Sequence, residues 1–173
     1  MVNFLCSGSD FLGKGIISQE RVVKKLFNDA KRDIIIFTFS LTLLYDILTP
    51  LEEALKKGVT LTLVFGKTSE KDLEKQKKII KTIFESNEMS NIFFYKAPEK
   101  HDFHAKVIIV DQSHAIVGSA NFTYQGYRKN HEIGVELIGK EIHPLTNMIN
   151  KFLASSPNLI SINDPEELAD VID

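Results

Sequence analysis

The sequence has little of what several classes of protein depend on. It contains one cysteine, Cys6, among 173 residues, so a disulfide within the chain is impossible and a cysteine-ligated zinc centre is disfavoured. The histidines do not form the HExxH pair of helical zinc hydrolases; they are His101, His104, His114, His131 and His143. We therefore expect neither a metal centre nor another cofactor.

A long apolar run and a strong net charge are absent as well. No stretch reaches the roughly 20 apolar residues that a transmembrane helix needs, and residues 1–8 lack the basic and apolar regions of a signal peptide. The formal net charge of −2 gives no overall attraction to a polyanion, so any basic binding surface would be local. We expect a cytoplasmic protein without a membrane span.

What is present is an ordinary globular composition, 43% hydrophobic and 25% charged, in which strand-like and helix-like patterns alternate. The second helix should begin with Thr49 as its cap and Pro50 in its first turn. We expect one domain, residues 1–173, of the α/β class, with its sheet sandwiched between helices. The pattern predicts helices at 19–31, 50–57, 70–86, 141–152 and 165–171, and strands at 33–39, 59–65, 91–96, 107–110, 115–118, 133–138 and shortly after 159.

The helix predicted at 70–86 has a lysine-rich exposed face. Two interpretations stay open: a surface that binds a polyanion, or a solvated helix face whose lysines are balanced by neighbouring acidic residues. The lysines are Lys71, Lys75, Lys77, Lys78 and Lys81, and the acidic residues are Glu70, Asp72 and Glu74.

The stretch 104–121 carries the strongest signal for chemistry. Two apolar runs, 107–110 and 115–118, are separated by a short polar segment and favour a β-hairpin. If Val110 pairs with Ala115, the hairpin gathers polar side chains at one end, because directly opposite residues share a face. The predicted patch contains His104 opposite Asn121 and Lys106 opposite Ser119. An anion bound among these groups would offset the cost of burying them.

These residue types suit attack on a phosphodiester. A neutral imidazole at His104 can attack phosphorus, while Lys106 supplies a fixed positive charge. The Ser119 hydroxyl and the Asn121 amide can donate to oxygens that gain negative charge in the transition state. A Glu132 carboxylate bonded to the far nitrogen of His104 would orient the ring. No metal is required if Lys106 and His104 supply the positive charge.

Two further sets of residues have expected roles near this stretch. Asp111, in the turn, and Gly118 are expected to be structural. The segment 122–130 mixes aromatic and basic residues, which suits stacking on bases and contact with phosphates, or an ordinary loop packed on the domain. Its candidate substrate-binding residues are Tyr124, Arg128 and Lys129.

At these residues the sequence resembles the phospholipase D superfamily. The pattern His104-x-Lys106-(x)4-Asp111, then Gly-Ser-x-Asn and Glu132, is similar to the HKD signature of that superfamily. The resemblance implies a phospholipase D-like fold with a mixed sheet, His104 as nucleophile, Lys106, Ser119 and Asn121 on phosphate, and Glu132 as the orienting acid. Two HKD motifs share one site in the family. A single motif therefore implies a homodimeric site, as in short bacterial endonucleases, and an inactive monomer.

Three functions follow as alternatives. The first is a metal-independent endonuclease that cleaves DNA or RNA through a covalent phosphohistidine. The second is a phospholipid phosphodiesterase with the same chemistry, and the third is an inactive binding or dimerisation module. A cytoplasmic nuclease would need to spare its own cell, so we also expect a specific target, a fused or separate specificity domain, or an inhibitor.

Overall fold

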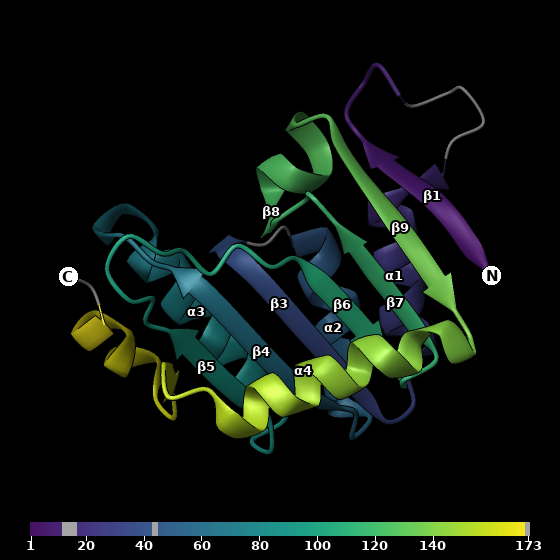
Figure 1. Ribbon diagram of the computed structural model, residues 1–173. Helices are drawn as coiled ribbons and strands as arrows, with labels where there is room; N and C mark the ends of the chain where they lie inside the picture. The colour runs from purple at the N-terminus through teal and green to yellow at the C-terminus, as the bar shows by residue number, and fades with distance from the viewer. Residues whose placement is uncertain (12–16, 43–44, 172–173) are drawn as a thin grey trace.

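The computed structural model describes residues 1–11, 17–42 and 45–171. One mixed sheet has the strand order β10-β5-β4-β3-β6-β7-β9-β1-β2, and β8 pairs with β3 beside it (Figure 1). Across the described part of the chain, no helix is long and apolar enough to cross a bilayer. The strands are β1 (Val2–Ser7), β2 (Ile17–Ser18), β3 (Asp33–Thr42), β4 (Thr60–Lys67), β5 (Asn91–Tyr95), β6 (Val107–Val110), β7 (His114–Gly118), β8 (Phe122–Thr123), β9 (Glu132–Ile138) and β10 (Leu159–Ser161).

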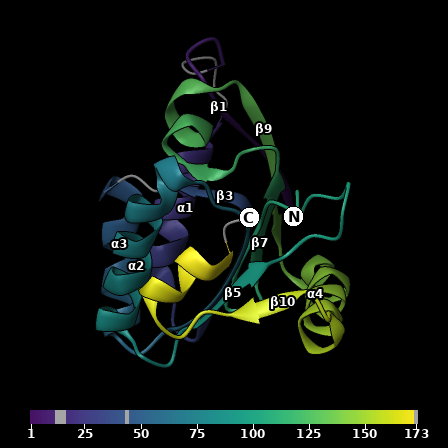
Figure 2. The same cartoon turned by 90° about the vertical axis from the view of Figure 1, so that its left-hand side faces the viewer.

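Helices cover both faces of this sheet (Figure 2), as the sequence predicts. The α-helices are α1 (Gln19–Asp29), α2 (Tyr45–Lys56), α3 (Glu70–Ser86) and α4 (His143–Ser155). Helices α1, α2 and α3 lie on one face and α4 lies on the other (Figure 2). The shorter helices are a π-helix, η1 (Gln125–Lys129), and two 3-10 helices, η2 (Lys140–Ile142) and η3 (Pro165–Val171).

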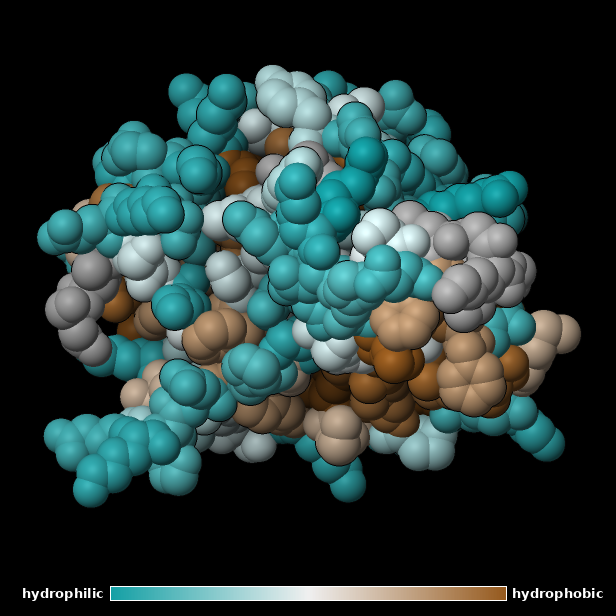
Figure 3. All heavy atoms as spheres, turned by 90° about the horizontal axis from the view of Figure 1, so that it is seen from above, coloured by the Kyte–Doolittle hydropathy of each residue, from teal (hydrophilic) through white to brown (hydrophobic). Residues whose placement is uncertain are grey.

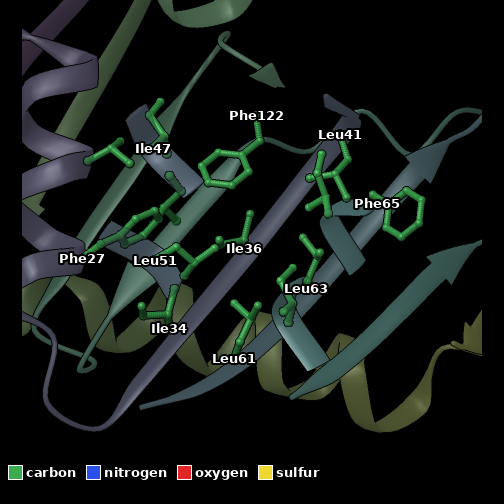
Figure 4. Packing of buried hydrophobic residues seen from close by; sticks show 14 of the residues in the cluster. Phe27, Ile34, Ile36, Leu41, Ile47, Leu51, Leu61, Leu63, Phe65 and Phe122 are labelled. Atoms are coloured by element: carbon green, nitrogen blue, oxygen red, sulfur yellow. The ribbon is translucent and has the colours of Figure 1, made fainter. Parts of the chain in front are cut away.

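The central strand β3 is buried because its residues are apolar on both faces. Ile34 and Ile36 pack against α1 and α2 with Phe27 and Leu51 (Figure 4). Ile35 and Phe37 face the α4 layer, where aromatic rings gather. The ring centroids of Phe37 lie 5.4 Å from Phe103 and 5.6 Å from Phe152. Parallel pairing of β3 with β4 brings the carboxyl ends of both strands to one edge of the sheet.

The predicted start of the second helix is wrong. Helix α2 begins at Tyr45, and Pro50 lies inside it. The Thr49 hydroxyl donates to the Tyr45 carbonyl oxygen at 2.9 Å and therefore does not cap a helix that starts after it. A proline in the second turn removes one backbone hydrogen bond, and the burial of Ile47, Pro50 and Leu51 against the core offsets that loss.

The predicted register of the hairpin is also wrong, by one residue. Val110 pairs with His114 and Val107 pairs with Val117. The turn begins with Asp111 and Gln112, both at φ 53°, and the Ser113 amide donates to the Val110 carbonyl at 3.1 Å. Both hairpin strands are apolar on both faces, so the hydrophobic pattern does not specify the register and the turn decides it. Lys106 consequently lies opposite Gly118, whose amide donates to the Lys106 carbonyl at 3.3 Å.

Candidate active site

The residues of the His-x-Lys and Gly-Ser-x-Asn motifs lie where several strands reach the same end of the sheet. Strands β3 and β4 end there, β6 and β9 begin there, and β7 ends there. His104 and Lys106 precede β6. The Lys106 Nζ lies 2.9 Å from His104 Nδ1 and donates to the His104 carbonyl oxygen at 2.7 Å. An imidazole and an ammonium group are therefore held in direct contact.

Phe39, near the end of β3, packs against this pair. Its ring centroid lies 4.9 Å from that of His104. The Lys106 Nζ is 5.8 Å from the Phe39 centroid, and the Nζ of Lys67, at the end of β4, is 5.3 Å from it. The Phe39 ring thus covers one side of His104 and also contacts Lys67, so two lysines lie near it at this end of the sheet.

Lys106 is 9% exposed, which is unusual for a lysine. Burial lowers the pKa of its ammonium group, because desolvation disfavours the charged form, and the Glu132 carboxylate raises the pKa in partial opposition. Among the described residues, no carboxylate forms an ion pair with Lys106. The charge is therefore buried without a bonded counter-ion.

Glu132, the first residue of β9, is held in place by two neighbours. It accepts hydrogen bonds from the Ser119 hydroxyl and from the Asn130 side-chain amide, the latter at 3.0 Å. The predicted bond from Glu132 to His104 is not formed in the single chain, where Lys106 occupies the Nδ1 side of the ring. The antiparallel pairing of β7 with β9 explains this contact: Ser119 follows β7 and its amide donates to the Ile133 carbonyl oxygen at 3.0 Å, so Ser119 lies beside Glu132.

Asn121 lies at the same end of the sheet, beside β3. Its Oδ1 accepts from the Ser40 amide at 3.4 Å, which leaves the side-chain NH₂ free to donate elsewhere. The Asn121 backbone is packed tightly against Gly126. A Cβ at Gly126 would lie 2.4 Å from the Asn121 carbonyl oxygen. Glycine at 126 is required for this close approach.

Asp111 lies at the opposite end of β6 from His104, in the turn. Its Oδ1 accepts from the backbone amide of Arg32 at 2.7 Å and of Asp33 at 3.2 Å, and its Oδ2 accepts from the amide of Lys31 at 3.0 Å. Gly118 lies opposite Gly134, and a Cβ at Gly118 would lie 2.8 Å from the Gly134 Cα. Asp111 ties the hairpin turn to the start of β3, and Gly118 allows β7 to approach β9 closely. Both contacts agree with the structural roles expected for these residues.

The candidate substrate-binding residues divide into two groups. Tyr124 is 41% exposed, and the Lys129 Nζ lies 6.0 Å from its ring centroid. Arg128 points elsewhere: its guanidinium pairs with Glu20 of α1, and at 2.7 Å with Asp46 of α2. Glu20 raises the Arg128 pKa through a hydrogen bond. This geometry favours a structural role for Arg128, and we leave it out of the site.

Several residues at the site were not singled out from the sequence. They are Phe39, Ser40, Lys67, Gly126 and Asn130. Phe39, Ser40 and Lys67 carry a signal that could have been used, since they end adjacent parallel strands and such ends gather at one edge of a sheet. Nothing in the local pattern marks Gly126 or Asn130. The Nε2 of His131, beside Glu132, lies 3.1 Å from the Asp10 carboxylate.

Within residues 1–11, 17–42 and 45–171, no group of three or more His, Cys, Asp or Glu side chains is arranged to hold a metal ion. The positively charged groups at the site are those of Lys106 and Lys67.

Solved structures share this fold over nearly the whole chain. Nuc from Salmonella typhimurium, a phospholipase D family member, aligns with a TM-score of 0.73 and 22% identity over 95% of this chain and 99% of that chain. NucT from Helicobacter pylori aligns at 0.71 with 14% identity over 94% and 99%. The phosphatidylserine synthase of Haemophilus influenzae aligns at 0.76 with 13% identity over 96% of this chain and 41% of that chain. The α/β fold with a mixed sheet is confirmed.

The DISARM protein DrmC of Bacillus paralicheniformis is 29% identical over 133 residues, which are 74% of this chain and 53% of that protein. The chain thus spans about half the length of this relative.

A family model described as "Cardiolipin synthase, PLD-like domain" matches residues 23–153. That range contains every motif residue from His104 to Glu132 and most of the sheet that positions them. The match confirms the resemblance inferred from the motif and the class of enzyme that it implies. The chain belongs to the PLD-like domain family, within the phospholipase D superfamily of phosphodiesterases.

Proposed function

We propose that this protein is a metal-independent endonuclease that cleaves a nucleic acid phosphodiester through a covalent phosphohistidine at His104. The observation that carries the proposal is the Lys106 ammonium, which is 9% exposed, in contact with His104 and without an ion-paired carboxylate. A buried unpaired cation is costly, and a bound phosphate group would offset that cost. The site is therefore suited to an anion that arrives with the substrate.

The contact between Lys106 and His104 sets the resting state of the imidazole. An ammonium group only donates, so Nδ1 accepts in this contact and the neutral ring carries its proton on Nε2. Protonated on Nδ1 as well, once Lys106 has moved away, the ring is an imidazolium whose Nε2–H can protonate a leaving oxygen. When a substrate phosphate draws Lys106 to its own oxygens, Nδ1 is released and can carry the ring proton. Nε2 is then free to attack phosphorus.

Two copies of His104 at a two-fold axis would divide these roles. Nε2 of one neutral ring attacks phosphorus, while the other ring, an imidazolium protonated on both nitrogens, gives its Nε2 proton to the leaving oxygen. The second ring, now unprotonated at Nε2, accepts a proton from the water that cleaves the phosphohistidine, and both rings return to their starting states. Lys106 and the Asn121 amide stabilise the charge on the phosphoryl oxygens in both steps.

An exposed apolar face offers a surface for the second copy. Figure 1 shows α4 crossing one part of the sheet and leaving β1 and the adjoining part of β9 open on that side. Phe4 is 72% exposed, and Phe4 and Val117 both pair with Val135, so all three share this face. Ile133, 58% exposed, continues it toward Ser119. Hydrophobic side chains gather in one area at the lower right of Figure 3.

A large apolar patch of this kind marks an interaction surface, and an isologous dimer is the commonest form of self-association. The patch includes Ile133, whose carbonyl oxygen accepts from the Ser119 amide. A second copy bound to the patch would therefore lie beside Ser119 and Glu132. We propose that this face forms the homodimer and completes the active site.

A phospholipid is the second candidate substrate, because the family model carries the name of cardiolipin synthase and one solved relative is a phosphatidylserine synthase. The nuclease is favoured because the fold matches Nuc and NucT over 99% of each of those chains, as expected for the short single-motif endonucleases that the sequence resembles. The Tyr124 ring beside Lys129 also suits a base next to a phosphate.

Purified protein, incubated in EDTA with end-labelled DNA, with RNA and with cardiolipin vesicles, tests the proposal. We expect cleavage of nucleic acid in EDTA, and a labelled fragment attached to the protein after a denaturing quench. His104→Ala should lose both. His143→Ala, an exposed histidine on α4, is the matched control and should lose neither. Loss of cleavage in EDTA, or full activity of His104→Ala, would refute the mechanism, and hydrolysis of cardiolipin alone would establish the second candidate.

A further inference from the structure

A groove of about 630 Å³ lies between α2, α3 and the turn that contains Tyr124 and Gln125. We propose that this groove binds the single-stranded nucleic acid that flanks the scissile phosphate. The inference rests on the proposed nuclease function and adds a binding surface outside the catalytic residues. Its lining includes three lysines and two tyrosines: Lys71, Lys75, Lys78, Tyr45 and Tyr124.

The lysines of α3 fall into two groups with different partners. Lys77 pairs with Glu166, and Lys81 lies 3.9 Å from Glu85. By contrast, Lys71, Lys75 and Lys78 form no ion pair among the described residues and are exposed. Their spacing of four and three residues places them on one side of the helix, facing the groove. Among the described residues, these three lysines are therefore not paired with Glu70, Asp72 or Glu74.

The acidic residues of the groove have other contacts. Glu52 pairs with Lys56 on its own helix, and Glu85 pairs with Lys81. Asp72 accepts a hydrogen bond from the Ser69 hydroxyl at 3.0 Å and forms no ion pair among the described residues. Three unpaired lysines therefore face one unpaired carboxylate. With Lys56 and Lys81 included, five lysines lie in or beside the groove against three carboxylates, a local positive excess that the overall charge of −2 conceals. Phosphate groups are the complementary ligand.

The tyrosines supply what the lysines lack, a surface for bases. Tyr45 is 75% exposed and Tyr124 is 41% exposed. An aromatic ring in water next to unpaired lysines is the combination with which proteins hold single strands, since each base can stack and each phosphate can meet a cation. The Lys129 Nζ, 6.0 Å from the Tyr124 ring centroid, adds a further positive charge at this end. A paired duplex would not offer its bases to these rings.

The groove also connects directly with the active site. Asn121 contacts Ser40, and two residues further along β3 and β8, Thr42 pairs with Thr123. Thr42 and Tyr124 line the groove. Two extended residues span about 7 Å, so one continuous strand could occupy both places. Because the groove adjoins the active site, it can bind the same nucleic acid strand that the active site cleaves.

Binding of fluorescent oligothymidylate to chains carrying His104→Ala, which cannot consume the probe, tests the inference. Two lengths are compared: about 16 nucleotides, enough to extend along the groove, and about 4 nucleotides, enough for the active site. The groove variant replaces Lys71, Lys75 and Lys78 with Gln. The matched control, with the same change in net charge, replaces the exposed Lys57, Lys140 and Lys151 with Gln.

We expect the groove variant to bind the long probe roughly 10- to 100-fold more weakly, and the slope of log K against log salt to fall by about 2, since each phosphate contact on a single strand contributes about 0.7. The short probe and the control variant should change little. Tyr45→Ala with Tyr124→Ala should weaken the long probe roughly 5- to 150-fold per stacked base without a change of slope.

Equal losses for both probe lengths, or equal losses for the groove and control variants, would overturn the inference. So would groove-dependent binding to phosphatidylglycerol vesicles together with unchanged oligonucleotide binding. The proposed nuclease function fails separately: wild-type protein would then leave DNA and RNA intact, while the binding experiment would still report on the groove.

Discussion

The Nζ of Lys106 lies 2.9 Å from the Nδ1 of His104, and the same ammonium donates to the His104 carbonyl oxygen at 2.7 Å. In the proposed mechanism, Lys106 has two roles: its contact with Nδ1 sets which ring nitrogen of His104 carries the proton, and its ammonium group supplies positive charge to the site. A substitution at 106 should therefore affect both the stabilisation of phosphate and the protonation of the nucleophile.

The alkaline side of the pH profile of kcat/KM should report the loss of the Lys106 positive charge. Burial lowers the pKa of its ammonium, so the charge is lost at a lower pH than for a free lysine of pKa about 10.4. Activity should therefore decline with rising pH before that value. Lys106→Arg stays charged, so its alkaline limb should move to higher pH, although its maximal rate should fall roughly tenfold or more. A limb that does not move would show that another group titrates.

Gly126→Ala should damage the site through Asn121. The added Cβ would lie 2.4 Å from the Asn121 carbonyl oxygen and 3.0 Å from its nitrogen, so the backbone must shift. We expect a loss of about 1–3 kcal/mol in the free energy of unfolding and a lower kcat. Gly58→Ala is the matched control: its φ of +91° makes alanine costly by about 1–2 kcal/mol, but no atom lies within 4 Å of the new Cβ.

Denaturant unfolding and turnover per folded molecule would be measured for both glycine variants. The control should lose stability and keep its turnover. If Gly126→Ala also kept full turnover, the packing of Gly126 against Asn121 would not position the amide for catalysis.

Asp111→Ala should reduce stability and spare the chemistry. The carboxylate accepts backbone amides of Lys31, Arg32 and Asp33, which join the start of β3 to the hairpin turn. Removing it should cost about 1–3 kcal/mol of unfolding free energy. Asp111→Asn keeps one acceptor oxygen and tolerates the φ of 53°, so it should lose less. A lower kcat with unchanged stability would place Asp111 in the chemistry instead.

Phe4→Lys should abolish the dimer and, with it, the activity. Phe4 is 72% exposed on the open sheet face, so the variant should fold, while a lysine there would desolvate a charge in an interface. Sedimentation velocity would measure the mass, and nuclease assays the rate. Met148→Lys, at a methionine that is 60% exposed on α4, is the control and should stay dimeric and active. A fully active Phe4→Lys monomer would contradict the shared site.

Much of the architecture could be predicted from the chain alone. The apolar runs of β3, β4 and β6 mark buried strands, and the amphipathic pattern of α3 gives its bounds, Glu70–Ser86, without error. Helix α2 could not be placed in the same way, because its start depends on packing against the sheet and not on the local cap that Thr49 and Pro50 suggest.

The active site also divides into features that the sequence predicts and features that depend on tertiary contacts. The sequence by itself determined which side chains are available for the proposed chemistry, because His104, Lys106, Ser119, Asn121 and Glu132 are groups suited to phosphoryl transfer through a histidine.

Only the tertiary structure decided which of these groups meet. The pairing of β7 with β9, which are separated in the chain by residues 119–131, brings Ser119 beside Glu132. The hairpin strands are apolar on both faces, so the hydrophobic pattern does not specify their register, and the turn places Lys106 opposite Gly118 instead of Ser119. The side chain of Arg128 is likewise turned away by Glu20 and Asp46, which lie on helices far away in the sequence. Contacts of this range leave no trace in a local pattern, because they depend on which distant elements the fold brings together.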